Sequence, residues 1–281
     1  MIKVRYILLT LIVLFLSACT SSSIGKNVAE NKVAKTSSLS KQINNTTNNI
    51  GGLTEANSKI QNSSSSQNIN NKVSKKIIVI DPGHADKANL QKEQLASGST
   101  EMKIKDGGGA EGIVTKTPEY IVNMAISMKL RDVLQKRDYT VIMTKTSNSV
   151  SLGNIERAEI GNKAKADLEI RIHADSSDDT RVTGASMLVP AQINSNTSKI
   201  YSISKKYGTK ILNIYCNEMK LENRGVVEHS DMTGFNWSKV PVVLIEVGFL
   251  SNPSEDKLLS NISYENKIAN ALADGICNAV N

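Results

Sequence analysis

Short apolar runs alternate with stretches of helical periodicity from residue 77 onward, and this pattern predicts an α/β domain. Short, mainly apolar runs bounded by turn residues predict strands at 77–80, 139–143, 182–189 and 240–249, and alternating apolar and charged residues predict another at 168–172. Apolar residues spaced three and four apart predict helices, at 117–136, 155–166, 198–219, 253–259 and 264–280. Because strands alternate with helices, we expect residues 77–281 to form a single domain with a mostly parallel mixed sheet flanked by helices.

Two segments of this region lack a regular apolar period. Residues 85–116 are polar and contain three consecutive glycines at 107–109, which do not have the spacing of a phosphate-binding loop. We expect this segment to be a mobile surface loop near the site. Residues 222–238 are predicted to be irregular.

The first 76 residues do not have the pattern of a folded domain. Lys3 and Arg5 precede an apolar run at 6–16 that is too short to span a membrane in the ordinary way. The run ends in Leu-Ser-Ala-Cys, which resembles the lipobox of bacterial lipoproteins and predicts a signal peptide at 1–18 with lipidation of Cys19. An ordinary secretory signal is the alternative, and either signal implies export. Residues 19–76 are rich in Ser, Asn and Lys and predict a disordered tether.

The charge is distributed unevenly between these two parts. Residues 1–76 contain ten Lys or Arg and two Glu, a net charge of +8, whereas the whole chain is +7, so residues 77–281 carry −1. The excess of basic residues therefore lies in the predicted signal peptide and tether. Because the predicted domain has no net positive charge, we expect no nucleic-acid partner.

The two cysteines of the predicted domain carry little information about function. Cys216 and Cys277 both fall in predicted helices. A disulfide is open to an exported protein, but two buried thiols are the favoured interpretation.

Three side chains at the ends of predicted elements have the chemistry of a metal site. His84 and His173 each follow a predicted strand, and Glu119 lies at the start of a predicted helix. Catalytic zinc sites use three such ligands and keep one position open. Glu246 lies inside the most apolar strand, where burial would raise its pKa into the range of a general base and acid.

Each of these residues also has a structural interpretation. Either histidine could be a hydrogen-bonded loop residue, and Glu119 could simply favour the helix N-terminus. Glu246 could form a structural ion pair with Arg224. The residue types and their spacing leave these alternatives open.

Residues 77–281 resemble the zinc-dependent N-acetylmuramoyl-L-alanine amidases of the AmiC-like family, also called amidase type 3. Four motifs carry the resemblance in the family's order: IVIDPGH ending at His84, Glu119 four residues before Asn123, IRIHAD around His173, and PVVLIEVGFLSN around Glu246. The resemblance implies one Zn²⁺ per domain held by His84, Glu119 and His173, with Glu246 as the catalytic residue.

The chain departs from the family pattern at several positions. Ala85-Asp86 stands where Gly-Gly is usual after the first histidine, Arg171 where Ser is common, and Asp175 where Asn is common. These departures bear on how the substrate is recognised more than on metal binding. Asp81 is a candidate for orienting one of the metal ligands.

A substrate groove is expected around the irregular segment at 222–238. Arg224, Asp231 and Asn236 are the predicted substrate-binding residues. His229 would accompany them, although a surface histidine is slightly favoured.

The lipobox resemblance at Cys19 implies an exported protein that is lipid-anchored at the cell membrane, and the amidase resemblance of residues 77–281 implies an enzyme that acts on the cell wall. Its expected reaction is hydrolysis of the amide between N-acetylmuramic acid and L-alanine of the peptidoglycan stem peptide. Peptidoglycan and the membrane are its expected partners, and a monomer its expected state. The alternatives are another exported zinc hydrolase, either a peptidase or a deacetylase, and an inactive wall-binding lipoprotein.

Overall fold

Six strands form one mixed sheet in the computed structural model, which describes residues 75–281. The sheet order is β4-β1-β5-β8-β6-β7, with bounds Thr140–Met143, Ile77–Pro82, Leu168–Asp175, Val242–Phe249, Ala185–Pro190 and Asn223–His229. The first four are parallel, β6 runs antiparallel to β8, and β7 is parallel to β6. The predicted mostly parallel mixed sheet is confirmed. The predicted signal peptide and Cys19 lie outside the described residues, as does the predicted tether except for Lys75 and Lys76.

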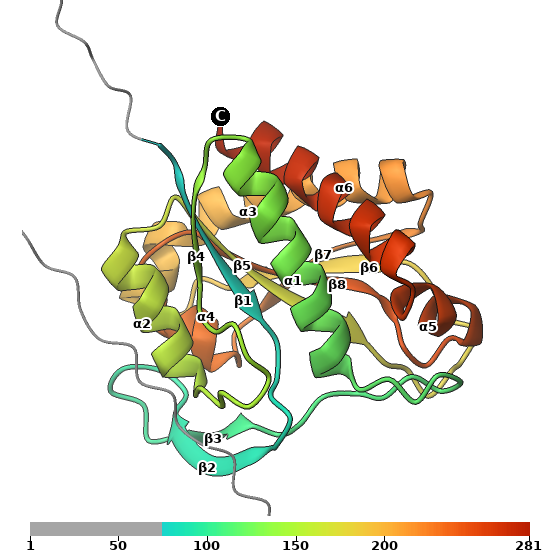
Figure 1. Ribbon diagram of the computed structural model, residues 1–281. Coiled ribbons are helices and arrows are strands. Elements are labelled where there is room, and N and C mark those ends of the chain that lie inside the picture. Colours follow the sequence, from blue (N-terminus) through green and yellow to red (C-terminus); the bar gives the residue numbers. More distant parts are fainter. Residues whose placement is uncertain (1–74) are drawn as a thin grey trace, which may run out of the picture. The chain divides into compact units, whose positions relative to one another are not determined.

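Helices cover both faces of this sheet (Figure 1). The helices α1 (Glu119–Lys136), α3 (Ser195–Met219) and α6 (Ile262–Val280) enclose the main apolar core with alternate residues of the central strands. On the other face lie α2 (Asn154–Ala164) and α4 (Thr233–Trp237), and α5 (Pro253–Leu259) follows β8. Within residues 75–281, no helix is both long and apolar enough to cross a membrane.

The segment predicted as a mobile loop contains a β-hairpin, so that prediction is wrong. Strands β2 (Asn89–Gln94) and β3 (Met102–Asp106) pair antiparallel in a separate two-stranded sheet. Buried Glu93 accepts hydrogen bonds from the first backbone N–H groups of α2, at 2.7 Å from Asn154 and 3.2 Å from Ile155. Polar contacts to the N-terminus of α2 therefore hold the hairpin against the domain. Because these contacts are polar, the sequence of the hairpin shows no periodic apolar pattern from which its strands could be predicted.

The segment predicted to be irregular is also ordered into regular elements. It contains the edge strand β7 and the five-residue helix α4. An edge strand with mostly polar and partly exposed residues lacks the apolar alternation that predicts strands. The helix α1 begins at Glu119, with Pro118 as its N-cap, two residues after the predicted start at 117.

The cysteine thiols are both free in the described structure, as favoured above. Cys216 is buried and Cys277 is partly buried. Burial raises the pKa of the Cys216 thiol to about 11, so this thiol stays protonated and unreactive at neutral pH.

A buried ion cluster joins β1, β5 and α2 beneath the ends of the strands. Asp81 is fully buried and accepts hydrogen bonds from Arg157 Nη1 at 2.6 Å, Arg171 Nε at 2.8 Å and Thr144 Oγ1 at 2.5 Å. Burial alone would raise the pKa of Asp81, but the two guanidinium groups hold it well below its usual range. The expectation that Asp81 orients a metal ligand by direct contact is wrong, because its oxygens bind these two guanidinium groups and the Thr144 hydroxyl.

Removing the Asp81 charge should destabilise the domain strongly. Asp81→Asn leaves two buried guanidinium groups without a counter-charge, and breaking such a pair costs about 3–5 kcal/mol. Urea unfolding followed by circular dichroism measures this loss. The control is Asp179→Asn, whose exposed pair with Arg181 should leave the midpoint unchanged. Equal midpoints for both variants and the parent would contradict the prediction.

Candidate metal centre

Three side chains from three separate elements converge at the carboxyl ends of β1 and β5. The ligand atoms of His84, Glu119 and His173 all lie within 4.8 Å of one another. The two imidazole rings meet edge to face, with centroids 4.9 Å apart and planes at 83°. His84 has a positive φ of 55°, which turns its side chain sharply away from the end of β1. The predicted ligands are therefore close enough to share one cation.

Glu119 lies between the two histidines. Its Oε1 is 3.1 Å from His173 Nδ1, and its Oε2 is 3.4 Å from His84 Nε2. Asn123 Nδ2, one helical turn later, donates to Oε1 at 3.0 Å, and the Ala110 N–H donates to Oε2 at 2.8 Å. These bonds fix the carboxylate at the helix start and explain the spacing of Glu119 and Asn123.

The protonation states of this cluster suit metal binding. Burial alone would raise the pKa of Glu119, but the two histidines and Asn123 lower it to about 2. Burial lowers the pKa of His173, so its imidazole is neutral near pH 7. His173 Nε2 is buried without a hydrogen-bond partner among the described residues. An ionised carboxylate and neutral imidazoles are the forms that ligate metals, so the donors fit the expected Zn²⁺.

Asp106 orients His84 from the end of the hairpin. His84 Nδ1 is 2.8 Å from Asp106 Oδ1, which leaves Nε2 facing Glu119. Asp106 also accepts the Gly108 N–H at 3.0 Å. A carboxylate on the second nitrogen of a ligating histidine is the usual supporting contact at metal sites. Asp106 was not predicted from the sequence, where its only signal is an acidic residue directly before three glycines.

Two glycines leave the space that the ligands occupy. A Cβ at Gly83 would collide with the His173 ring. A Cβ at Gly109 would lie 2.7 Å from Glu119 Oε2 and 2.9 Å from His84 Cδ2. Gly107, two residues earlier, has open space at this position. The Gly-Gly-Gly run thus covers the site closely through its last residue.

Glu246 lies next to His173 because the two residues are register partners on β8 and β5. Both line a cavity of about 210 Å³, together with His84, Glu119 and Asp175. Burial raises the pKa of Glu246 well above its usual value, and the carboxylates of Glu119 and Asp175 raise it further. Its Oε2 is buried without a hydrogen-bond partner among residues 75–281. This is a carboxyl group with proton-transfer capacity in the same cavity as the three candidate metal ligands.

The structural interpretation of Glu246 as the partner of Arg224 is wrong. Arg224 Nη1 donates to the Thr183 carbonyl at 3.2 Å and to Glu222 at 3.4 Å. Its guanidinium lies 5.5 Å from the Phe249 ring centroid. These contacts hold Arg224 away from the Glu246 carboxyl.

The three predicted substrate-binding residues lie in different surroundings. Asp231 is exposed, is 3.3 Å from His229 Nδ1, and lines a cavity beside the hairpin. Arg224 is on β7, and Asn236 is fully buried and donates to the Ser230 carbonyl at 2.9 Å. The structure therefore does not bring these three side chains together in one groove, and Asn236 supports the loop from below.

Residues 78–278 match the Amidase_3 family, described as N-acetylmuramoyl-L-alanine amidase. The germination-specific N-acetylmuramoyl-L-alanine amidase of Bacillus subtilis is 29% identical over 222 residues, which is 73% of this chain and 79% of that protein. The amidase AmiA of Escherichia coli is 23% identical over 241 residues, covering 72% and 75% of the two chains.

Solved structures share the same fold. Ami1 from Mycobacterium smegmatis matches with a TM-score of 0.66 and 21% identity over 73% of this chain and 96% of its own. The CwlD amidase from Clostridioides difficile, solved in complex with the GerS lipoprotein, matches with a TM-score of 0.59 and 26% identity over 73% and 98%.

Adding one methyl group at Gly109 should weaken metal binding. The new Cβ of Gly109→Ala would displace Glu119 and His84, and disturbing the support of metal ligands typically costs about 10–100-fold in affinity. The control Gly107→Ala meets no atom within 4 Å and should bind Zn²⁺ like the parent. Calorimetric titration of the metal-free proteins with Zn²⁺ measures both. Parent-like affinity in Gly109→Ala would show that the ligands do not bind the metal in this arrangement.

Proposed function

Because this chain belongs to the Amidase_3 family of N-acetylmuramoyl-L-alanine amidases, we propose that residues 77–281 are a zinc-dependent catalytic domain. Its reaction is hydrolysis of the amide between N-acetylmuramic acid and the L-alanine of the peptidoglycan stem peptide. The observation that carries the zinc proposal is the convergence of His84, Glu119 and His173 beside the buried carboxyl group of Glu246.

One Zn²⁺ per domain is the proposed cofactor. His84, Glu119 and His173 would hold it, with Asp106 keeping the His84 ring in the required orientation. Zinc in such a site lowers the pKa of a water molecule and polarises the scissile carbonyl. With three protein ligands the zinc would keep one position for water, and His84, Glu119 and His173 line the same cavity as Glu246.

Glu246 is the proposed general base and acid. Its carboxylate would take a proton from the attacking water and later deliver one to the leaving amine of L-alanine. The raised pKa makes the protonated form of this carboxyl group stable enough to hold that proton between the two steps. Its place opposite His173 keeps the proton next to the metal-binding side chains.

The alternatives have weaker support. The family match over residues 78–278 supports an amidase over a peptidase or a deacetylase. An inactive wall-binding lipoprotein would not need a buried carboxyl group beside three potential metal ligands.

The N-terminal part would determine where the enzyme acts. We propose a lipoprotein signal peptide at 1–18, lipidation at Cys19, and a tether at 19–76 that links the membrane to the catalytic domain. This proposal rests on the sequence alone, because these segments lie outside the described residues apart from Lys75 and Lys76. In it, the exported domain reaches the cell wall while its anchor stays in the membrane.

Glu246→Gln should abolish hydrolysis and preserve the fold. The amide has nearly the same shape but cannot accept the proton, and a general base contributes about 10²–10⁴-fold to the rate. The measurement is release of L-alanine amino groups from purified peptidoglycan, with Zn²⁺ content determined in parallel. Glu222→Gln, at an exposed position, is the matched control and should retain full activity. Wild-type hydrolysis by Glu246→Gln would refute its assignment.

Metal removal should abolish activity reversibly. Chelation would take away the group that activates water, whereas the ion cluster of Asp81 and the apolar core remain to hold the fold. Activity should return on addition of about one equivalent of Zn²⁺ per chain. Full hydrolysis by chelated protein, verified as metal-free by mass spectrometry, would exclude a zinc mechanism.

A further inference from the structure

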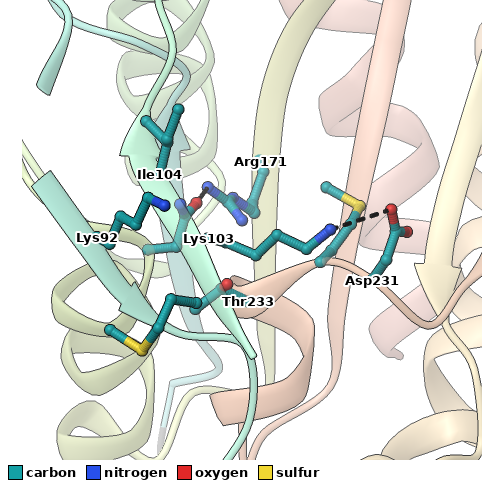
Figure 2. Close-up of a pocket in the computed structure, with 9 residues that line it drawn as sticks. Lys92, Lys103, Ile104, Arg171, Asp231 and Thr233 are labelled. Atoms are coloured by element: carbon teal, nitrogen blue, oxygen red, sulfur yellow. Dashed lines mark hydrogen bonds and ion pairs between the residues drawn. The ribbon is translucent and has the colours of Figure 1, made fainter. Parts of the chain in front are cut away.

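A second cavity, of about 550 Å³, lies between the hairpin and the segment that leads into α4 (Figure 2). The hairpin forms one wall, with Lys92, Met102, Lys103 and Ile104. The remaining lining residues come from α2, β5 and the segment that leads into α4, and they are Asn154, Arg171, Asp231, Met232 and Thr233. None of the three ligands proposed for the metal lines this cavity, so the catalytic chemistry does not account for it.

The cavity wall carries more positive than negative charge. Lys92, Lys103 and Arg171 are cationic, and Asp231 is the single acid among the nine lining residues. Figure 2 shows Lys103 extending from β3 toward Asp231, at an Nζ to Oδ2 distance of 4.0 Å. Lys103 also pairs with Glu101 at 3.3 Å. Both acids are largely exposed, so these pairs are weak and a ligand can replace them.

Arg171 gives the cavity a fixed cationic group. Its side chain is buried, its Nε donates to Asp81 at 2.8 Å, and its Nη2 donates to Asn154 Oδ1 at 2.8 Å. Nη1 makes no hydrogen bond with any residue of the described part of the chain, and it lies so close to Gly234 that a Cβ there would collide with it. The guanidinium is therefore held rigidly with one donor group to spare, which favours an anionic ligand.

The cavity shares part of its wall with a neighbouring cavity at the candidate metal centre. Ile104, Asn154, Arg171 and Met232 also line a neighbouring cavity of about 200 Å³, whose wall includes His84 and His173. A group bound at Arg171 thus belongs to the same surface as the amide undergoing hydrolysis. The muramic acid side of that amide is a sugar, and the peptide side carries the carboxylates.

We propose that Lys103 and Arg171 form a subsite for a carboxylate of the stem peptide, on the peptide side of the scissile bond. This inference rests on the proposed function, since the amidase reaction defines the substrate. A carboxylate would accept from the free Nη1 of Arg171 and replace Asp231 at the Lys103 ammonium. The hairpin thereby contributes to substrate selection, and the chain prefers stem peptides with a free carboxylate over amidated ones.

Binding should be measured separately from catalysis. The full chain carrying Glu246→Gln is titrated calorimetrically at low salt with N-acetylmuramoyl-L-alanyl-D-glutamic acid and with its diamide, in which both carboxylates of the glutamic acid are amidated. The acid should bind about tenfold tighter, which corresponds to about 1.4 kcal/mol, and 0.5 M NaCl should reduce this ratio.

The added substitution Lys103→Met should bring the acid-to-amide ratio close to one. The matched control is Lys205→Met, which removes an exposed lysine paired with Glu228 at 2.8 Å and should leave the ratio unchanged. Equal binding of acid and amide by the parent would overturn the subsite. An undiminished ratio in Lys103→Met, or competition by inorganic phosphate as strong as by the acid, would overturn it as well.

A separate assay tests the catalytic proposal. The wild-type chain is incubated with both compounds, and the release of lactyl-linked sugar is followed. If neither compound is hydrolysed while the acid preference in binding persists, the amidase proposal fails and the carboxylate subsite stands. If both are hydrolysed and binding shows no acid preference, the subsite fails and the amidase proposal stands.

Discussion

The buried contact between Asp81 and two arginines is the interaction on which the site geometry depends. Asp81 of β1 and Arg171 of β5 are register partners in the parallel sheet, and Arg157 reaches the same carboxylate from α2. His84 follows Asp81 by three residues, and His173 follows Arg171 by two. The ion cluster therefore fixes the register of β1 and β5, which brings His84, just beyond the end of β1, close to His173 near the end of β5. Because these charges are buried, a shifted register of β1 against β5 would leave them unpaired, which is strongly destabilising.

Much of the fold could be predicted because its central strands are buried on both faces. Such strands read as continuous apolar runs, as β1 and β8 do, and the helices between them keep their period. The hairpin and β7 could not be predicted in this way. Their residues are mostly polar, and contacts made only after folding hold them in place, such as Glu93 at the start of α2 and the Trp237 indole donating to the Gln94 carbonyl at 3.0 Å.

The same physical difference separates the site residues that were predicted from those that were missed. His84, His173 and Glu246 follow or interrupt strong apolar strands, and Glu119 opens a periodic helix, so their relative positions follow from the topology of a parallel sheet. Their convergence is a consequence of strand order and register. Asp106 and Lys103 belong to the hairpin, and no pattern of apolar and polar residues in the sequence predicts where the hairpin lies. Residue types at the ends of predicted elements, together with the family resemblance, gave the candidate ligands, whereas the supporting carboxylate and the cationic wall required the three-dimensional structure.

Two residues of the short strand β3 have different proposed roles. Lys103 faces the cavity beside the site, and Asp106 orients His84. Three positions separate them along β3, which is too short a distance for one end to be rebuilt without moving the other. With the roles proposed for Lys103 and Asp106, replacement of this hairpin by one of another length or sequence would alter metal binding and substrate preference together. Substrate preference can therefore change through this segment only if the backbone of β3 keeps its position. Single side-chain substitutions near Lys103 satisfy that condition.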